Sequence, residues 1–212
     1  MRTIIFVAYC VLGMNSLFAN SQAFYDVFVD TSAISGTTGF VDFAFNPTPG
    51  AQLGFAEILN FAGGTLMGVP TVTGDVSGTL PGILILNNDT PVNEYFQGFI
   101  FGPSMTFNLL MAGPAISNPG SFAVGSLFSY GMLDPTGTPV LTTDPAGSAL
   151  NVAVNPGGTI AITTFPSSPG GPPIVNITPE PASVLMLFSA VSLLGLLAIL
   201  RKRTSRVPME TR

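Results

Sequence analysis

The stretch FVDFAF, residues 40–45, alternates between two faces in the manner of a β-strand. Val41, Phe43 and Phe45 fall on one face and Asp42 falls on the other, which is the two-residue period of an extended chain with one buried side. Six residues are too few for most helices but enough for a strand. We therefore predict a half-buried strand here.

The same alternation, or the same β-branched and aromatic content, recurs along the chain. In residues 53–59 the odd-numbered positions Leu53, Phe55, Glu57 and Leu59 share one face, and in residues 122–132 the even-numbered positions do. No segment between the strands has the period of a helix. The further predicted strands span residues 25–29, 53–59, 82–86, 95–101, 105–111, 122–132, 150–154 and 159–165.

Glycine and proline, 24 and 19 of the 212 residues, separate these segments. Pairs such as Gly63-Gly64, Gly102-Pro103 and Gly113-Pro114 are typical turn signals. Many short antiparallel strands joined by such turns predict an all-β fold. We expect a two-sheet sandwich, jelly-roll-like, with a partly closed barrel as the alternative.

The N-terminus has the layout of a secretory signal peptide. Basic Arg2 precedes an apolar run over residues 4–12, and a small-residue site, Ser21-Gln22-Ala23, follows. The run is too short to span a bilayer, which needs about 20 apolar residues. We expect residues 1–23 to be removed by cleavage after Ala23, with the Sec translocon as the export partner.

The C-terminus has the pattern of a membrane-spanning segment. Residues 182–200 carry no charge and are about as long as a spanning helix requires. The cluster Arg201-Lys202-Arg203 follows at once, and positive charge next to a span stays cytoplasmic. We expect one transmembrane helix over 182–200, with everything before it exported.

Between these ends lies a single domain by size. Pro166-Ser-Ser-Pro-Gly-Gly-Pro-Pro173 has the composition of a linker, because proline stiffens the chain and the glycine pair supplies a joint. We therefore divide the exported part into an ectodomain over 24–165, a linker over 166–178 and a tail over 179–212.

The exported body has an unusual charge distribution. Residues 24–178 contain nine Asp and Glu and no Lys or Arg, so their formal charge is −9. Such a surface repels phosphates and offers no cation to replace their counterions, which excludes nucleic acid as a partner. The only cysteine, Cys10, lies in the expected signal peptide, so the mature body contains no disulfide.

The residue inventory argues against an enzyme. The chain has no His, and residues 24–178 have no Cys, Lys or Arg, so the usual Ser-His, Cys-His and Ser-Lys nucleophile systems are impossible. Zinc sites built from His or Cys are absent for the same reason. Glu57 and Glu94 are a formal carboxylate pair for glycoside hydrolysis, but nothing in their spacing favours it. We predict a noncatalytic protein without a cofactor.

Calcium is the one metal that the composition allows, because hard cations take oxygen ligands. Asp26 with Asp30, or Asp89 with Glu94 and the nearby Asn87 and Asn88, are the candidate ligands. Their spacing matches no calcium loop, and acids in turns are common for backbone reasons alone.

Two further readings stay open. Many carbohydrate-binding modules are sandwiches with aromatic platforms, and the body offers Tyr25, Tyr95 and Tyr130 but no Trp. An outer-membrane β-barrel also uses alternating strands, although a C-terminal spanning helix would retain the chain in the inner membrane.

Pro179-Glu180-Pro181 stands immediately before the apolar segment and its basic cluster. The three parts in this order resemble the PEP-CTERM sorting signal that exosortase reads. The resemblance covers residues 179–203. The start of the body, over residues 30–43, also resembles PEP-CTERM ectodomains of unknown role.

The resemblance implies that exosortase acts near Pro179-Glu180-Pro181 and releases the body from its anchor. It implies a Gram-negative bacterium that makes exopolysaccharide, and a mature protein at the cell surface or in the extracellular matrix. We therefore expect a structural or adhesive protein, with exopolysaccharide as a possible partner.

Overall fold

The computed structural model describes residues 22–122 and 124–180. The transmembrane helix expected over 182–200, the cluster Arg201-Lys202-Arg203 and Pro181 lie outside this part of the chain, as does the signal peptide apart from its last two residues. Among the described residues no helix is long and apolar enough to cross a membrane.

Ten strands form one hydrogen-bonded sheet in which every strand pair is antiparallel. Only three short helical turns, η2 (Ser32–Ile34), α2 (Pro114–Ser117) and η3 (Pro156–Gly158), interrupt the described chain. The all-β prediction is thereby confirmed. The strands are β1 (Gln22–Asp30), β2 (Thr38–Pro47), β3 (Phe55–Thr73), β4 (Val76–Gly78), β5 (Leu84–Asn87), β6 (Glu94–Ala112), β7 (Ser126–Leu133), β8 (Ser148–Val154), β9 (Ile160–Thr164) and β10 (Val175–Pro179).

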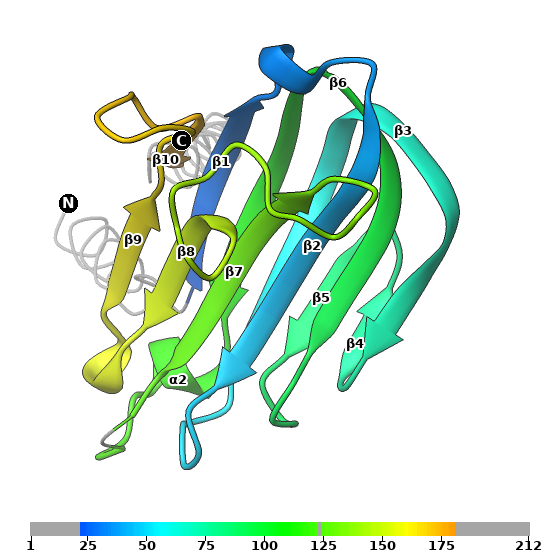
Figure 1. Ribbon diagram of the computed structural model, residues 1–212. Coiled ribbons are helices and arrows are strands. Elements are labelled where there is room, and N and C mark those ends of the chain that lie inside the picture. Colours follow the sequence, from blue (N-terminus) through cyan, green and yellow to red (C-terminus); the bar gives the residue numbers. More distant parts are fainter. Residues whose placement is uncertain (1–21, 123, 181–212) are drawn as a thin grey trace, which may run out of the picture. The chain divides into compact units, whose positions relative to one another are not determined.

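The two longest strands run through both halves of the fold. The first part of β6 pairs with β2, its second part pairs with β1, and β3 accompanies it along almost its whole length. One half of the sheet therefore has the order β9-β8-β7-β2-β6-β3, and the other has β10-β1-β6-β3-β5-β4. Figure 1 shows β3 and β6 arching together over one end of the molecule.

Glycines make this bend possible. A Cβ added to Gly63, whose φ is +112°, would lie 2.1 Å from the Ser104 carbonyl oxygen, and one added to Gly102 would lie 2.2 Å from that of Gly63. The two backbones therefore approach more closely than any side chain allows. Two register shifts between Leu59 and Gly64 fall at the same place, and such bulges bend and twist a strand.

An aromatic core joins the two halves face to face. The ring centroid of Phe43 in β2 lies 5.0 Å from that of Tyr130 in β7. It also lies 5.4 Å from the ring centroid of Phe107 and 6.0 Å from that of Phe61, which belong to the other half. These spacings are those of favourable aromatic pairs. The fold is therefore sandwich-like, although its two layers are one continuous sheet and not two separate ones. We call the layer with β2 the β2 layer and the layer with β1 the β1 layer.

Two predicted turns are wrong for the same reason. Gly63-Gly64 and Gly102-Pro103 were expected to end strands, but β3 and β6 continue through them. Thr31 covers the bend: its hydroxyl donates to the Gly102 carbonyl at 2.7 Å and its amide to that of Pro103 at 3.2 Å. Glycine and proline end strands elsewhere in the chain, but at these two positions they mark the place where β3 and β6 pass from one layer to the other.

The domain does not end at residue 165. Val175–Pro179 forms β10 and pairs with β1, with Tyr25 opposite Pro179 and Val29 opposite Val175. Pro166 and Pro173 form a bridge that closes the proline-rich stretch into a loop. The expected linker over 166–178 is therefore wrong, because Val175 is buried in the core and fixes this segment to the sheet.

This correction is testable at Val175. We expect Val175→Ala to lower the free energy of unfolding by about 1–3 kcal/mol, because it removes buried methyl groups from a packed core. Denaturant unfolding of the full chain measures the change, and Ser167→Ala, in the exposed part of the preceding loop, is the control. Equal stability of the two variants would mean that residues 166–178 are a linker after all.

Asp42 is buried more deeply than its place opposite the core suggests. Its Oδ1 atom is buried and has no hydrogen-bond partner within the described structure. Burial, with a smaller contribution from the nearby Glu94 carboxylate, raises the pKa of Asp42 to about 7. The folded protein therefore favours the protonated carboxyl, whose unfolded pKa is near 3.8.

This shift makes stability depend on pH in a defined direction. The contribution of Asp42 to the free energy of unfolding is fully present below about pH 4 and is lost as the pH rises through 7. We expect Asp42→Asn to match the parent near pH 4 and to be more stable at pH 8 by up to about 4 kcal/mol. Urea midpoints at both pH values measure it, with Asp89→Asn, an exposed acid, as the charge-matched control. An Asp42→Asn effect that is the same at both pH values would contradict the assignment.

Candidate functional site

The outward face of β1 carries an exposed aromatic side chain, Phe28. Tyr25, Val27 and Val29 point into the core, so Asp26 and Phe28 point to the opposite face. Phe28 is 46% exposed. The sequence contained a signal for this residue, because Phe28 stands between Asp26 and Asp30 at a position where the alternation predicts a polar side chain. The prediction of strand 25–29 did not use this signal.

Polar side chains surround Phe28 on the neighbouring strands. Phe28 lies opposite Asn176 of β10 and opposite Thr106 of β6. In the next outward row, two residues along β1, Asp26 lies opposite Thr178 and opposite Asn108. Directly opposite residues point to the same side of a sheet, so these side chains form one patch across three strands.

A bulge in β3 adds a fourth strand to the patch. Asn60 has a φ of +54°, a conformation that Asn tolerates better than most residues, and it stands at the first register shift of β3. Its Nδ2 atom donates to Oδ1 of Asn108 at 2.7 Å, and Nδ2 of Asn108 in turn donates to Oδ1 of Asp26. The two amides are thereby held in fixed orientations, with the carboxylate at the end of the chain of hydrogen bonds.

These residues line a hollow of about 290 Å³ in the β1 layer. We call it the Phe28 hollow. The hydrogen bonds among described residues leave the side chains of Thr106, Asn176 and Thr178 unused, so they are available to a ligand. The lining consists of Asp26, Val27, Phe28, Asn60, Thr106, Phe107, Asn108, Asn176 and Thr178.

The tyrosines named as candidate platforms do not serve that purpose. Tyr95 and Tyr130 are completely buried, and Tyr25 is 7% exposed. The Tyr95 hydroxyl binds inside the fold, to Gln97 and to the Thr79 region. All three rings pack in the core, because alternation places each of them on the inner face of its strand.

The candidate calcium ligands are not brought together in pairs. Asp26 and Asp30 are four residues apart on one strand, which separates them by about 13 Å. Asp30 instead accepts the Ser32 amide, and hydrogen bonds from Ser32 lower the pKa of Asp30. Asp89 lines a second hollow with Asp75 and Asn87, whereas Glu94 lies near Asp42. Within residues 22–122 and 124–180, no three Asp, Glu, His or Cys side chains form a group that could hold a metal ion.

The formal glycosidase pair is also separated. Ile58 is buried in β3 and Tyr95 in β6, so the adjacent Glu57 and Glu94 point outward from the β1 layer and the β2 layer respectively. Both layers lie between the two carboxylates. They cannot act on one bond, because catalytic carboxylates of glycosidases are at most about 9.5 Å apart.

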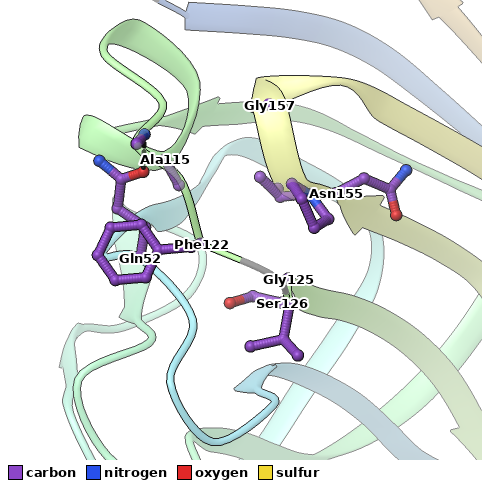
Figure 2. Close-up of a pocket in the computed structure, with 11 residues that line it drawn as sticks. Gln52, Ala115, Phe122, Gly125, Ser126, Asn155 and Gly157 are labelled. Carbon is purple, nitrogen blue, oxygen red and sulfur yellow. Dashed lines mark hydrogen bonds between the residues drawn. The ribbon is translucent and has the colours of Figure 1, made fainter.

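A small crevice at the opposite end of the fold from the bend is not a ligand site. Figure 2 shows Gln52 and Phe122 on one side of it and Asn155 and Gly157 on the other. Its volume is about 10 Å³, which is room for one water at most. Phe122, predicted to begin a strand, lies outside β7 and is 46% exposed.

Asn88 has a structural role and is not available as a calcium ligand. It is 4% exposed, and its Oδ1 accepts the Gly54 amide at 2.7 Å. Its Nδ2 donates to the Gln52 carbonyl at 2.8 Å and to the Ser126 hydroxyl at 2.7 Å. One side chain thus joins the start of β3 and the start of β7 to the turn after β5.

We expect Asn88→Ala to lower the free energy of unfolding by about 2–4 kcal/mol, because it leaves several buried groups without a partner. The neighbouring Asn87→Ala is the matched control, since the Asn87 side chain makes none of these bonds. Thermal unfolding of both variants measures the difference. If Asn87→Ala cost as much as Asn88→Ala, the structural assignment of Asn88 would be wrong.

The predicted sorting motif begins at the last residue of the sheet. Pro179 ends β10, Glu180 is exposed, and Pro181 follows outside the described residues. At the other end of the chain, Ala23 is the second residue of β1 and lies opposite Met111. Because Tyr25 and Pro179 are partners, the chain enters and leaves the domain at the same end of one strand pair.

Comparison with protein-family models, curated proteins and solved structures gives no significant match to this chain.

Proposed function

We propose that this chain is an exported, noncatalytic protein of the cell surface or extracellular matrix, sorted by exosortase and structural or adhesive in an exopolysaccharide context. In the proposed precursor, residues 1–23 are a signal peptide and a jelly-roll-like sandwich precedes one spanning helix over 182–200. Arg201-Lys202-Arg203 holds the end of the precursor in the cytoplasm.

The observation that carries the proposal is the position at which the fold ends. β10 finishes at Pro179, so the domain is complete before Glu180 and Pro181. Cleavage within or just after this tripeptide removes the tail without removing a strand from the sheet. Cleavage after Ala23 likewise leaves the β1 pairs from Phe24 to Asp30 in place.

The charge of the domain supports a role in a hydrated matrix. Residues 24–178 carry nine acids and no bases, so no ion pair with Lys or Arg is formed within them and the domain repels copies of itself. Many of its exposed positions are Thr, Ser, Asn or Gly, although ten large apolar side chains, Phe28 among them, are exposed as well. A surface of this kind stays solvated without binding polyanions.

Catalysis is not part of the proposal, because the chain has no His and residues 24–178 have no Cys, Lys or Arg to form the usual nucleophile systems. The Phe28 hollow contains one carboxylate, Asp26, whose Oδ1 already accepts a hydrogen bond from Asn108. A carbohydrate-binding module is the second candidate function, and this hollow is the observation that favours it.

Mass spectrometry of the protein from its native host tests the sorting. After separation of inner membrane, outer membrane and medium, we expect a chain that starts at Phe24, ends between Thr178 and Pro181, and lies at the surface or in the medium. The variant Glu180→Ala/Pro181→Ala should accumulate as the uncleaved precursor, because it alters the motif and leaves β10 intact.

Ser167→Ala, in the loop before β10, is the control and should be processed like the parent. A mature parent chain that retains Arg201–Arg212 in the inner membrane would contradict exosortase sorting and make the protein a permanently anchored one.

A further inference from the structure

The Phe28 hollow combines features that a purely structural surface does not require. A large apolar ring is half exposed between two outward acids of β1, Asp26 and Asp30, and the amides beside it are held by hydrogen bonds. Leaving apolar area in water is unfavourable. An exposed ring among oriented polar groups is the composition of a small-molecule binding site.

We propose that the Phe28 hollow binds a neutral sugar unit of a polysaccharide. The inference deepens the proposed function, on which it rests, because it gives the ligand class and the residues for an adhesive role in a polysaccharide matrix. It also replaces the buried tyrosines with a platform that is exposed.

The Phe28 ring supplies the apolar half of such a site. A sugar ring has one face of C–H groups and a rim of hydroxyls. The C–H face packs on the face of an aromatic ring, which carries partial negative charge and attracts the weakly positive hydrogens. Phe28 is flanked by Asn176 on β10 and Thr106 on β6, so hydroxyls at the rim of a stacked sugar meet polar partners on both sides.

Asp26, Asn108 and Asn60 supply the polar half. Hydroxyls both donate and accept hydrogen bonds, and this row offers both functions, since Asp26 accepts and the amides do either. Asp26 and Phe28 are two positions apart on β1, which separates them by about 7 Å. A sugar ring stacked on Phe28 can therefore form a hydrogen bond with Asp26 at its edge. Because the amides are already oriented, little side-chain entropy is lost on binding.

The size of the hollow fits a unit of a chain and not a large isolated ligand. Its volume of about 290 Å³ is at the lower limit of ordinary ligand sites, which is about 300 Å³. The hollow lies on the open face of a sheet and not inside a cavity. A polymer can therefore place one unit in it while its neighbours remain outside.

The charges of the domain select neutral polymers. A uronic acid or sulfated sugar would bring its anion next to Asp26, and residues 24–178 provide no Lys, Arg or His to compensate. Like charges in contact without a counter-charge are repulsive. A neutral sugar has no such penalty and uses Asp26 as an acceptor.

Binding of the full-length chain to soluble polysaccharides tests the site. The protein is purified in an amine-oxide detergent, which avoids the sugar headgroups of glucoside detergents. Dextran, laminarin and galactomannan are the neutral probes and alginate is the anionic one, with binding followed by affinity electrophoresis. We expect retardation by at least one neutral polymer and none by alginate.

Three variants locate the binding. Phe28→Ala should weaken it at least tenfold, whereas Phe28→Trp should retain or strengthen it, because the ring face is kept. Asn108→Ala should weaken it at least threefold by releasing Asp26 and Asn60. Phe122→Ala is the matched control, since Phe122 has the same exposed fraction as Phe28 and lies by the crevice of Figure 2.

The inference is overturned if the parent binds no neutral polymer, if alginate binds best, if Phe28→Ala binds like the parent, or if Phe122→Ala loses as much affinity. Its failure is separate from that of the proposed function, because binding is measured on purified protein and sorting is measured by fractionation. A correctly sorted protein that binds none of the polymers would overturn this inference alone.

Discussion

The close approach of β3 and β6 at their glycines is the constraint on which the rest of the fold depends. Gly63 and Gly102 bring the two backbones together where a Cβ on either would lie about 2 Å from a carbonyl oxygen. Because the two strands bend there as a pair, β3 and β6 stay hydrogen-bonded to each other through the bend. Their other partners change: β6 pairs with β2 before the bend and with β1 after it. The aromatic core from Phe43 to Phe107 can then form between two parts of the same sheet.

The sequence predicted individual strands well and long-range arrangement poorly, for a physical reason. Alternation reports which residues of a strand share a face, so the inward side of β2 and the all-β class were correct. Glycine and proline report only that the backbone is unusual, not whether it turns back or changes layer. Gly63-Gly64 and Gly102-Pro103 were therefore assigned as turns, and β10 was missed because its neighbours have the composition of a linker.

In the candidate site, too, the sequence predicted local features better than long-range arrangement. Tyrosine, aspartate and asparagine are named as candidate binding residues because of their side-chain chemistry. Burial, however, decides which of them a ligand can reach. Alternation alone places Tyr25 inward and Phe28 outward on the same strand. The role of Asn60 depends on a bulge, and the role of Asn88 on three partners distant in sequence, so neither is visible in local spacing.

The last strand connects the proposed sorting to the Phe28 hollow. Asn176 and Thr178 line the hollow from β10, and Pro179 ends the same strand. A cut before Val175 would remove both residues and expose the β1 edge, whereas a cut after Pro179 leaves the hollow whole. The sheet thus limits where the proposed processing could separate the tail from a domain whose Phe28 hollow is intact. The proposed motif begins at Pro179, the last residue of β10, so cleavage after Pro179 would satisfy this limit and leave every strand of the sheet in place.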